Sequence, residues 1–566
     1  MTTGGASVDV LIAGGGPFGL TLAIELGRRG VDVAVIDARP GTAVNPQANA
    51  TQARTMEHFR RLGFADEVRA LGLPADYPTD IAYFTRYTAR ELARFRRPPS
   101  RDAVQLAREG AAAIGMNNAA ELPHRVSQKF VEPVLRRHAE RVASVEYGVG
   151  LQSFSQDATG VDAVAVDSRT GATRGIRARY LVGGDGARSL VRRELGIRLA
   201  GETGVTRDFM GGRMVAVHLR ARGFYHAVPH DRAWMYWAFN TERRSWVAAV
   251  NGVDEFAFHT QLKPDEEAQD VGPDLARRLF DQVMGRSIAI ELLSVDTWIA
   301  GHALVADRFG DGRVLIGGDA AHLFTPAGGL GYNTAVEDAV NLGWKLAALV
   351  RGVGGPALLD SYEAERRPLA LRNTGFARQL ARSIGEFVPD PALERDDAEG
   401  EAARAAAADY LEAHARREFN IPGITFGGRY DASPVILSDG LAPTADRMDV
   451  YEPSASPGGR LPHLWLDDGA SIYDRLGPDW ALIATQDASD EERAIADAAG
   501  AAGVALTIVR VTTPEARSLY AAPFVLVRPD QIVAWRGDGR GIGATGMFDT
   551  VLGRAAAVAR PAAARA

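Results

Sequence analysis

The sequence predicts an α/β fold with a parallel sheet, an inserted antiparallel sheet and a small C-terminal α/β domain. Three observations predict it. A strand, a glycine-rich turn, a helix and a second strand follow one another between residues 8 and 37. Short apolar strands that end in Gly-Asp turns return near residues 185 and 319. Between them, residues 209–297 alternate in polarity and are rich in aromatic side chains.

Size and composition limit what the chain can be. Its 566 residues suffice for two or three domains, and 46% of them are hydrophobic. A formal net charge of -7 offers no basic footprint for nucleic acid. Without cysteine the chain has no disulfide, no cysteine-ligated zinc and no redox-active dithiol, and we expect no metal site.

No apolar run has the length of a membrane-spanning helix. The first residues also lack the basic region that precedes the apolar core of a signal peptide, because the first apolar run is itself a predicted strand. We therefore expect no membrane association and a cytoplasmic location.

The first element is a strand–turn–helix–strand unit. Residues 8–13 form a short apolar strand, and the turn GGGPFG with Gly14, Gly16 and Gly19 follows at once. Apolar residues then recur at helical spacing, and a second apolar strand ends in Asp37. This is the dinucleotide-binding fingerprint in its full context. Gly14 permits the tight turn, Gly16 lets a pyrophosphate approach, Gly19 lets helix and strand pack, and Asp37 can meet ribose hydroxyls.

The following elements belong to the same domain, up to the aromatic-rich region that begins at residue 209. Helices are predicted over 54–62 and 125–142, and strands over 144–151, 161–166 and 177–182.

After the aromatic sheet region, a buried strand at 313–316 and helices at 333–350 and 362–382 return to the first domain. Residues 390–417 are charged and rich in alanine, and we expect an exposed linker helix without a functional role.

The C-terminal part is predicted to be a domain of its own. Strands at 480–484, 504–511 and 524–527 alternate with a helix at 491–501. The expected division is a discontinuous first domain (1–80, 105–205 and 290–385), a sheet domain (81–104 and 206–289), a helical linker (386–450) and the C-terminal domain (451–566).

Two later turns, Gly184-Asp185-Gly186 and Gly318-Asp319, each follow an apolar strand. Ligands of α/β sheets bind at the ends of strands. Only one nucleotide-binding βαβ unit is present, which disfavours an enzyme with one Rossmann domain for each of two dinucleotides. Together with the first turn, the three corners indicate one extended cofactor that the chain reaches three times.

The motifs GGGPFG, GGDGARSLVR and GGDAAHLFTPAGGLGYNTAVEDAVNLGWKL resemble, in sequence and order, those of the single-component FAD-dependent aromatic hydroxylases. This is the para-hydroxybenzoate and phenol hydroxylase family, and the resemblance covers about residues 8–385. The segments RTMEHFRRLG and PGGRLPHLWL are similar to the phenol-hydroxylase branch, which includes 2,4-dichlorophenol 6-monooxygenase. The resemblance implies a Rossmann-like FAD-binding fold, an inserted substrate sheet and a C-terminal thioredoxin-like domain, here without cysteine and so without a redox role.

The resemblance also implies the reaction. NAD(P)H would reduce FAD, and O2 would then form a flavin C4a-hydroperoxide that hydroxylates a phenolic ring, ortho to its hydroxyl. The implied partners are a small phenolic substrate, O2 and NAD(P)H, in a homo-oligomer.

Carried over to this chain, the family's cofactor contacts fall on the three corners and on the loop after Pro326. In that loop, glycines let the backbone approach a flat ring, and the helix that follows directs its positive end toward reduced flavin. The implied cofactor residues are Gly14, Gly16, Pro17, Phe18, Gly19, Asp37, Ala38, Arg39, Gln47, Arg54, Gln128, Asp185, Gly186, Asp319, Pro326, Gly328, Gly329, Gly331, Tyr332 and Asn333.

One position departs from the family pattern. The family often has arginine in a PRA-like segment, whereas this chain has Pro46-Gln47-Ala48. We expect Arg54 to take over the phosphate contact. Gln47 leaves the choice between NADH and NADPH open, although the family favours NADPH.

A phenol reacts faster as its phenolate, so a base or a cation is expected near the ring. His124 is the candidate base, Arg125 the candidate to stabilise a phenolate, and the Pro326 carbonyl a second means of orienting the substrate, whereas His322 is expected to be structural. The candidate pocket walls are Trp234, Tyr236, Trp237, Phe239 and Phe324, each of which is equally expected as ordinary core.

Three alternatives stay open. The same scaffold could hydroxylate or epoxidise a larger polyketide-type aromatic. The chain could bind flavin without catalysis, although the intact loop at residues 328–333 argues against that. The first βαβ unit alone would also fit an NAD-dependent dehydrogenase.

Overall fold

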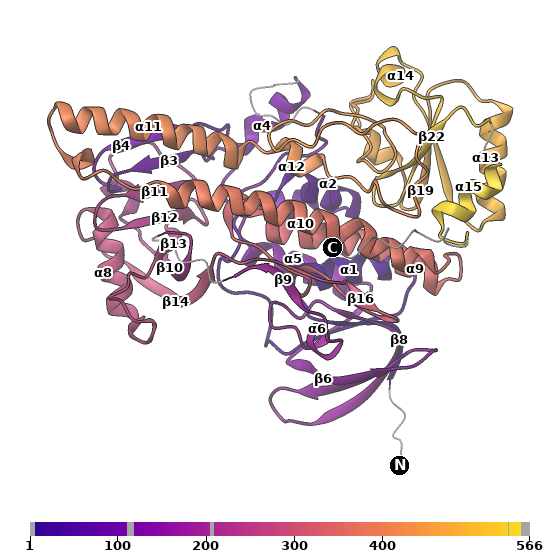
Figure 1. The fold of residues 1–566 in the computed structure, drawn as a ribbon, viewed down its shortest axis with the longest axis horizontal. Coiled ribbons are helices and arrows are strands. Elements are labelled where there is room, and N and C mark those ends of the chain that lie inside the picture. The colour runs from indigo at the N-terminus through magenta and orange to yellow at the C-terminus, as the bar shows by residue number, and fades with distance from the viewer. Residues whose placement is uncertain (1–5, 110–117, 204–208, 541–542, 556–566) are drawn as a thin grey trace, which may run out of the picture.

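The computed structural model describes residues 6–109, 118–203, 209–540 and 543–555. Figure 1 shows an aromatic-rich sheet at the left end, the C-terminal domain in yellow at the right, and the long helix α10 (Ala357–Glu386) running between them. Among the described residues, no helix is both long and apolar enough to cross a bilayer.

The first sheet has eight strands and confirms the predicted parallel core. Its main order is β16-β17-β8-β1-β2-β5, and β6 and β7 extend it next to β8. The pairs from β17 to β5 are all parallel. The strands are β1 (Ala6–Ala13), β2 (Val33–Asp37), β5 (Ser144–Tyr147), β6 (Val149–Gln156), β7 (Val161–Asp167), β8 (Thr173–Gly183), β16 (Gly310–Asp311) and β17 (Val314–Ile316).

Helix α1 (Pro17–Gly27) lies between the sheet and two other helices, α5 (Gln128–Glu140) and α9 (Leu330–Val350). It is buried around most of its circumference, which explains its continuously apolar sequence. The remaining helices of this domain are α2 (Ala53–Leu62), α3 (Ala65–Arg69), α4 (Ser100–Arg108) and α6 (Leu190–Glu194). A small sheet of β9 (Leu199–Glu202), β15 (Ala303–Ala306) and β18 (His322–Leu323) lies beside them.

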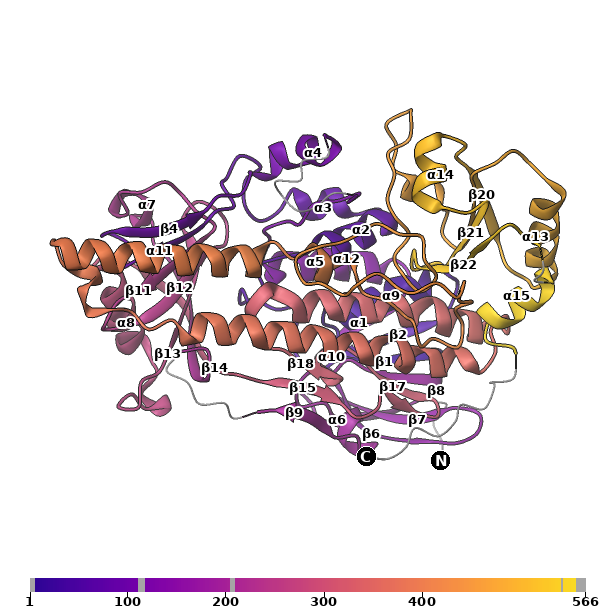
Figure 2. The same cartoon turned by 45° about the horizontal axis from the view of Figure 1, so that its top comes forward.

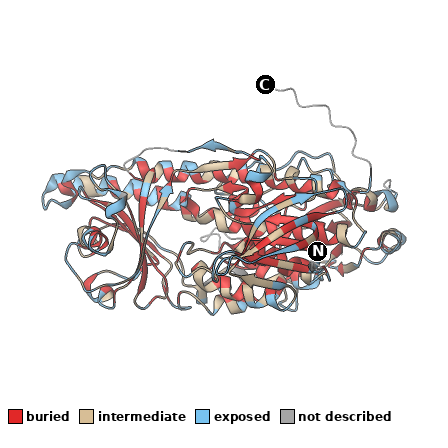
Figure 3. Cartoon of the chain, turned by 90° about the horizontal axis from the view of Figure 1, so that it is seen from below, coloured by how far each residue is buried: buried red, intermediate tan, exposed pale blue. Residues whose placement is uncertain are grey.

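The second sheet has the order β14-β10-β13-β12-β11-β3-β4 and is antiparallel except for the β11–β3 pair. It continues to Ala300, beyond the expected boundary at residue 289. Figure 3 shows that most of its inner strands are buried. The elements are β3 (Ile81–Phe84), β4 (Glu91–Phe95), β10 (Gly212–Arg220), β11 (Met235–Phe239), β12 (Arg244–Ala249), β13 (Glu255–Gln261), β14 (Glu291–Ala300), α7 (Phe224–Ala227) and α8 (Pro273–Met284).

Helix α11 (Ala398–Phe419) differs from the expected exposed linker. It packs along β4, as Figure 2 also shows, and its inner face buries Leu411, His414 and Glu418. The short helix α12 (Pro422–Phe426) follows and packs on α2. This segment therefore joins the two sheets instead of only connecting domains.

The C-terminal part is an α/β domain, as predicted. Its sheet has the order β20-β19-β21-β22, with one parallel pair and two antiparallel pairs. The elements are β19 (Trp480–Ala484), β20 (Leu506–Arg510), β21 (Phe524–Val527), β22 (Val533–Gly537), α13 (Asp490–Ala501), α14 (Pro514–Tyr520) and α15 (Ala544–Val551).

Buried charges connect this domain to the first one. Glu57 on α2 is fully buried and binds two guanidinium groups, those of Arg54 and of Arg460 from the C-terminal domain. The Arg54 guanidinium also donates to Gln531 Oε1 at 2.7 Å and to the Asp530 carbonyl at 2.8 Å. The expected phosphate contact of Arg54 is therefore wrong, because its side chain is committed to the domain interface.

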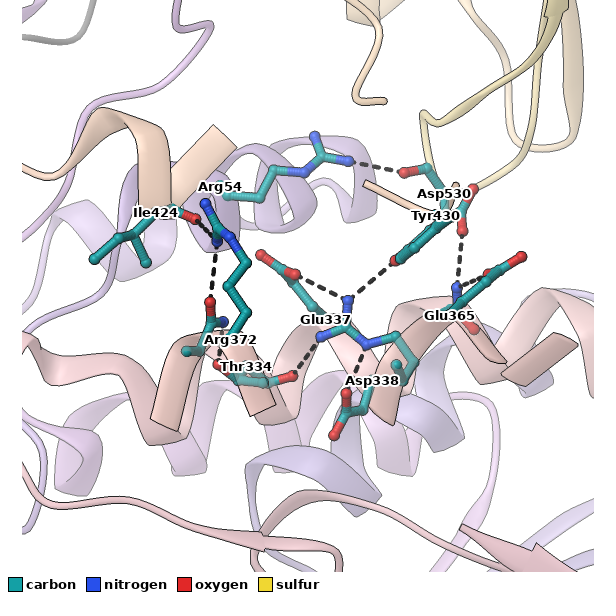
Figure 4. Close-up of polar contacts among 12 residues, drawn as sticks. Arg54, Thr334, Glu337, Asp338, Glu365, Arg372, Ile424, Tyr430 and Asp530 are labelled. Atoms are coloured by element: carbon teal, nitrogen blue, oxygen red, sulfur yellow. Dashed lines mark hydrogen bonds and ion pairs between the residues drawn. The ribbon is translucent and has the colours of Figure 1, made fainter. Parts of the chain in front are cut away.

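A second buried group of charges lies between α9 and α10. Figure 4 shows Glu337, Asp338 and Tyr430 turned toward one guanidinium, that of Arg366 on α10. Asp338 also accepts from His322 Nε2 at 2.6 Å, and both side chains are fully buried. His322 is thus structural, as expected.

Replacing Glu57 with glutamine tests the interface. The change leaves the buried guanidinium groups of Arg54 and Arg460 without a counter-charge, so we expect the free energy of unfolding to fall by about 3 kcal/mol. Urea denaturation measures it. Glu146→Gln, which removes a surface pair with Arg174, is the matched control and should cost less than about 1 kcal/mol. Equal effects of the two substitutions would contradict the structural role of Glu57.

Candidate active site

The three glycine-bearing corners lie side by side. β8 pairs with β1 and with β17, and Gly183 is in register with both Ala13 and Ile316. Gly14 has a φ of 116°, and a side chain there would begin 2.2 Å from the Gly184 carbonyl oxygen. The first and second corners are therefore in direct backbone contact, which only glycine at position 14 allows.

The first turn is open on the side where a ligand would approach. A side chain on Gly19 would begin 1.9 Å from the Gly14 carbonyl oxygen, whereas one on Gly16 would meet only Arg39, at 3.7 Å. Helix α1 begins after Gly16 with Pro17 in its first turn, and no side chain caps it. Its N-terminal N–H groups are thus available to an anion such as a pyrophosphate, which this turn fits.

The Phe18 side chain packs on the core side of the three corners and not on the side where a ligand would approach. Its side chain is 4% exposed, and side chains on Gly184, Gly317 or Gly318 would overlap or touch its ring. The side chain of Phe18 therefore supports the corners from the core. Only its main chain remains available for the expected cofactor contact.

Asp37 holds the glycine turn in place. Its carboxylate accepts from the Gly15 N–H at 2.7 Å and from the Arg39 main chain and guanidinium, each at 2.8 Å. The hydrogen bond between the Asp37 carboxylate and the Arg39 guanidinium raises the pKa of Arg39. Tyr147, which pairs with Asp37 across β5 and β2, donates to the Gly15 carbonyl at 2.7 Å. No motif marks Tyr147, because only the strand register brings it to the turn.

The two other aspartates retain oxygens for a ligand. Asp185 Oδ2 accepts from the Leu190 and Val191 N–H groups at the start of α6, while its buried Oδ1 has no partner among the described residues. Asp319 is accessible to solvent, yet the surrounding protein desolvates it and raises its pKa. A carboxylate that solvent can reach but that protein surrounds on most sides is expected on the wall of a cleft. Both carboxylates fit hydroxyl groups of a dinucleotide cofactor.

The glycine loop before α9 is held by hydrogen bonds on both sides. Gly328 adopts a φ of 73°, donates its N–H to Glu418 Oε1 at 3.0 Å and accepts from Gln52 Nε2 at 3.0 Å. Asn333 accepts from the Gln52 N–H and the Thr55 hydroxyl, and donates to the Ala50 and Gly329 carbonyls. All of its amide capacity is used by protein, so its expected cofactor contact is not through the side chain.

Glu418 is a site residue that the sequence analysis missed. It is 5% exposed, and its second oxygen lies 2.7 Å from His414 Nε2. His414 Nδ1 in turn lies 3.0 Å from Ser383 Oγ on α10. No sequence signal indicated this, because a carboxylate in a charged, alanine-rich helix is typical of a solvated face.

Buried polar side chains surround this loop. Among the described residues, Asn49 Oδ1 and Thr325 Oγ1 are buried and have no hydrogen-bond partner, and the buried hydroxyls of Thr51 and Tyr332 lie next to each other. Burial raises the pKa of the Tyr332 phenol. Such groups are costly when they stay unpaired, and a flavin ring edge carries carbonyl and N–H groups that could satisfy them. The residues present therefore fit FAD.

The remaining candidates of the cofactor set lie around these elements. Gln128 begins α5. Its main-chain N–H donates to the Ala48 carbonyl at 2.7 Å, and its Nε2 donates to Glu132. Gln47 and Ala38 are exposed. Gly186 and Gly331 lie at the second corner and in the first turn of α9.

The second sheet places the aromatic candidates on opposite faces. Trp237 and Phe239 stack with each other and with Tyr83, at centroid distances of 6.1 to 6.2 Å. Trp237 Nε1 and Tyr83 Oη are buried without a partner among the described residues. Alternation along β11 turns Tyr236 the other way, against Phe224 of α7. Tyr236 is therefore core and not a pocket wall, the first of the two expected alternatives.

Phe324 is also separate from that aromatic layer. Its ring packs edge-on against His322 at 5.1 Å, in a small cluster with Leu330 and Ala377.

His124 is not placed to act as a base. Its main chain pairs with Thr51, and its Nε2 donates to the Leu71 carbonyl at 2.7 Å. Burial lowers its pKa to about 4, so it is a weak proton acceptor at neutral pH. The expected role of His124 as the base is therefore wrong. Arg125, by contrast, lies with its guanidinium 3.9 Å from the ring centroid of Trp234.

Family comparisons agree with this geometry. The model of the FAD binding domain matches residues 7–377, and that of the C-terminal domain of aromatic-ring hydroxylases matches residues 454–555.

The chain belongs to the FAD-dependent aromatic hydroxylases.

Its relatives act on small and large aromatic compounds. Tetracenomycin B2 monooxygenase-dioxygenase of Streptomyces olivaceus is 31% identical, with 97% of this chain and 98% of the relative covered. Phenol 2-monooxygenase of Pseudomonas sp. (strain EST1001) is 30% identical, with 82% and 76% covered. A structure of RebC with bound 7-carboxy-K252c superposes with a TM-score of 0.87 at 34% identity, over 98% of this chain and 100% of that one.

Gly16→Val tests the cofactor site of this hydroxylase. The new side chain has room in the protein but would occupy the approach to the α1 N-terminus, so we expect a normal fold and at least tenfold weaker FAD binding. The flavin-to-protein absorbance ratio and the circular dichroism spectrum measure the two properties. Gly175→Val, in an open position on β8, is the matched control and should retain FAD. Undiminished FAD binding by the Gly16 variant would exclude this turn as the pyrophosphate site.

Proposed function

We propose that this hydroxylase uses NAD(P)H and O2 to hydroxylate a phenolic ring, ortho to the hydroxyl group. The observation that carries the proposal is that strand register brings the three cofactor corners together, while Ala327 of the held glycine loop packs in the same buried cluster as Trp237 and Phe239 of the second sheet. The cytoplasmic location, the homo-oligomeric state and the preference for NADPH stay predictions within it.

When bound, FAD supplies the electron transfer and oxygen activation. Gly14, Gly16 and Gly19 would bring the backbone to its pyrophosphate, and Asp185 and Asp319 would accept from its hydroxyl groups. Gly328, fixed by Gln52 and Glu418, would let the main chain lie close to the ring. The buried polar side chains of Asn49, Thr51, Thr325 and Tyr332 would hold its polar edge.

The aromatic face supplies the apolar wall. Trp237 and Phe239, buried in the core of the second sheet, would form the apolar layer behind a flat substrate and help to exclude water, which limits the loss of activated oxygen as hydrogen peroxide. With His124 unsuited as a base, Arg125 and the Pro326 carbonyl are the remaining candidates for contact with the substrate. Pro326 is exposed although its neighbours Thr325 and Ala327 are buried, as expected of a residue at the edge of a site.

A polycyclic, polyketide-type aromatic is the second candidate substrate. The specific observation that favours it is the share of each relative's own length that this chain matches. Aklavinone 12-hydroxylase RdmE of Streptomyces purpurascens is 31% identical and matches over 97% of this chain and 98% of its own length, whereas phenol 2-monooxygenase matches over 76% of its length.

A substrate panel tests the proposal. The purified protein should be yellow, and phenol, catechol, 1-naphthol or a hydroxyanthraquinone should stimulate its NAD(P)H and O2 consumption. Mass spectrometry should find a product with one added oxygen atom. Faster coupled turnover of the anthraquinone than of phenol would favour the polycyclic candidate. A flavin-loaded protein that none of these compounds stimulates would contradict the proposed function.

Glu418→Ala tests the held loop. Without the acceptor for the Gly328 N–H the loop should loosen and admit water, so the fraction of NAD(P)H that ends as hydrogen peroxide should rise several-fold. A peroxidase-coupled assay measures it. Glu418→Gln keeps an acceptor and should restore most of the coupling. The control Glu412→Ala, on the exposed face of α11, should behave as wild type. Unchanged coupling in Glu418→Ala would contradict the role of this contact.

A further inference from the structure

Two arginines beside the proposed site lack the counter-charges that buried arginines normally have. Arg125 is 7% exposed, and Arg97 is half-buried. Both line one pocket with Pro74, Thr79 and Ser100. Neither forms an ion pair with a carboxylate among the described residues. This is unusual, because buried charges are almost always paired.

Their neighbours do not supply the missing charge. The Arg97 guanidinium donates to the Phe419 carbonyl at 2.8 Å, and the Arg125 guanidinium stacks on Trp234. Asp80, which accepts from the Arg97 main-chain N–H, is ion-paired with Arg94. Burial lowers the pKa of Arg97 to about 10 and that of Arg125 to about 9, and the charge of Arg97 adds to the effect on Arg125.

Two series of contacts connect the pocket to the glycine loop. Phe419, which contacts Arg97, directly follows Glu418, the acceptor for the Gly328 N–H. His124, which precedes Arg125, pairs with Thr51, and the next residue, Gln52, donates to the Gly328 carbonyl. Each arginine is therefore connected, through a few intervening residues in contact with one another, to the loop that would face the flavin.

We propose that Arg97 and Arg125 form an anion subsite for a carboxylate on the aromatic substrate, so that the hydroxylase acts on aromatic acids. This rests on the proposed function, because it names a substrate class for the same site. A phenolate alone would need one cation, whereas two guanidinium groups suit the two oxygens of a carboxylate. Trp234, which is buried, holds the Arg125 guanidinium in place at the pocket by stacking on it.

Binding to the FAD-loaded enzyme tests the subsite. The probes are 3-hydroxy-2-naphthoate, its neutral carboxamide and 2-naphthol, each titrated against the flavin absorbance spectrum without NAD(P)H. We expect the acid to bind at least about tenfold more tightly than the amide or the naphthol. Equal or weaker binding of the acid, or no binding of it, would overturn the proposal. FAD loading and substrate-stimulated NAD(P)H oxidation are measured separately, so a failure of the proposed function is distinguishable.

Variants assign the preference to these side chains. Arg125→Met and Arg97→Gln should each abolish most of the preference for the acid over its neutral carboxamide. Arg96→Gln, at the neighbouring position with a 72% exposed side chain, should keep the preference. If the Arg125 and Arg97 variants keep it as well, the proposal is wrong.

Thermal unfolding gives a second readout. The acid should raise the Tm of the wild type and leave that of Arg125→Met unchanged, while Arg125→Met without ligand should not be less stable, because it loses an unpaired buried charge. Inorganic pyrophosphate separates the other source of an anion, the phosphates of a dinucleotide. Displacement of the acid by pyrophosphate only at far higher concentration supports the proposal. Binding of pyrophosphate without binding of the acid would overturn it.

Discussion

The backbone contact between the first two glycine corners is the constraint on which the site depends. β1, β8 and β17 end at the same level of one parallel sheet, and Gly14 touches the Gly184 carbonyl because neither position carries a side chain. Phe18 fills the space beneath, against Gly184, Gly317 and Gly318. Segments about 300 residues apart in the chain thereby form one surface, and a single extended cofactor can contact all of them.

Around this surface, buried polar contacts serve to fix the position of the main chain more than to stabilise the fold. Asn333 uses its whole amide to hold the segment of Ala50 and Gln52 against the glycine loop. Glu418 reaches the same loop from α11, and Asp37 reaches the first turn. Isolated buried hydrogen bonds contribute little net stability, but each one fixes the backbone that faces the ligand. The rigid, pre-formed surface that results is suited to hold a cofactor ring against an aromatic wall.

The C-terminal domain is attached through buried charges as well as through an apolar contact between Trp344 and Trp480. Without cysteine it has no redox dithiol, and its side of the interface meets Arg54 and Glu57. Because Arg54 is used there, the departure at Gln47 from the family's arginine is not compensated at that position. The difference between expectation and structure has a physical cause: nothing in the local sequence around Arg54 indicates its contacts with Gln531 and Asp530, which lie 477 and 476 residues later.

Local sequence determined the βαβ unit, the three glycine corners, the aromatic sheet and the separate C-terminal domain, because strand length, glycine spacing and alternation act over a few residues. It also indicated His322 as structural. Only the tertiary structure decided that Tyr236 faces α7, that His124 donates to a carbonyl, that Glu418 and Tyr147 reach the site, and that Arg97 lies beside Arg125. These depend on strand register and on packing between distant segments, which spacing along one segment does not encode.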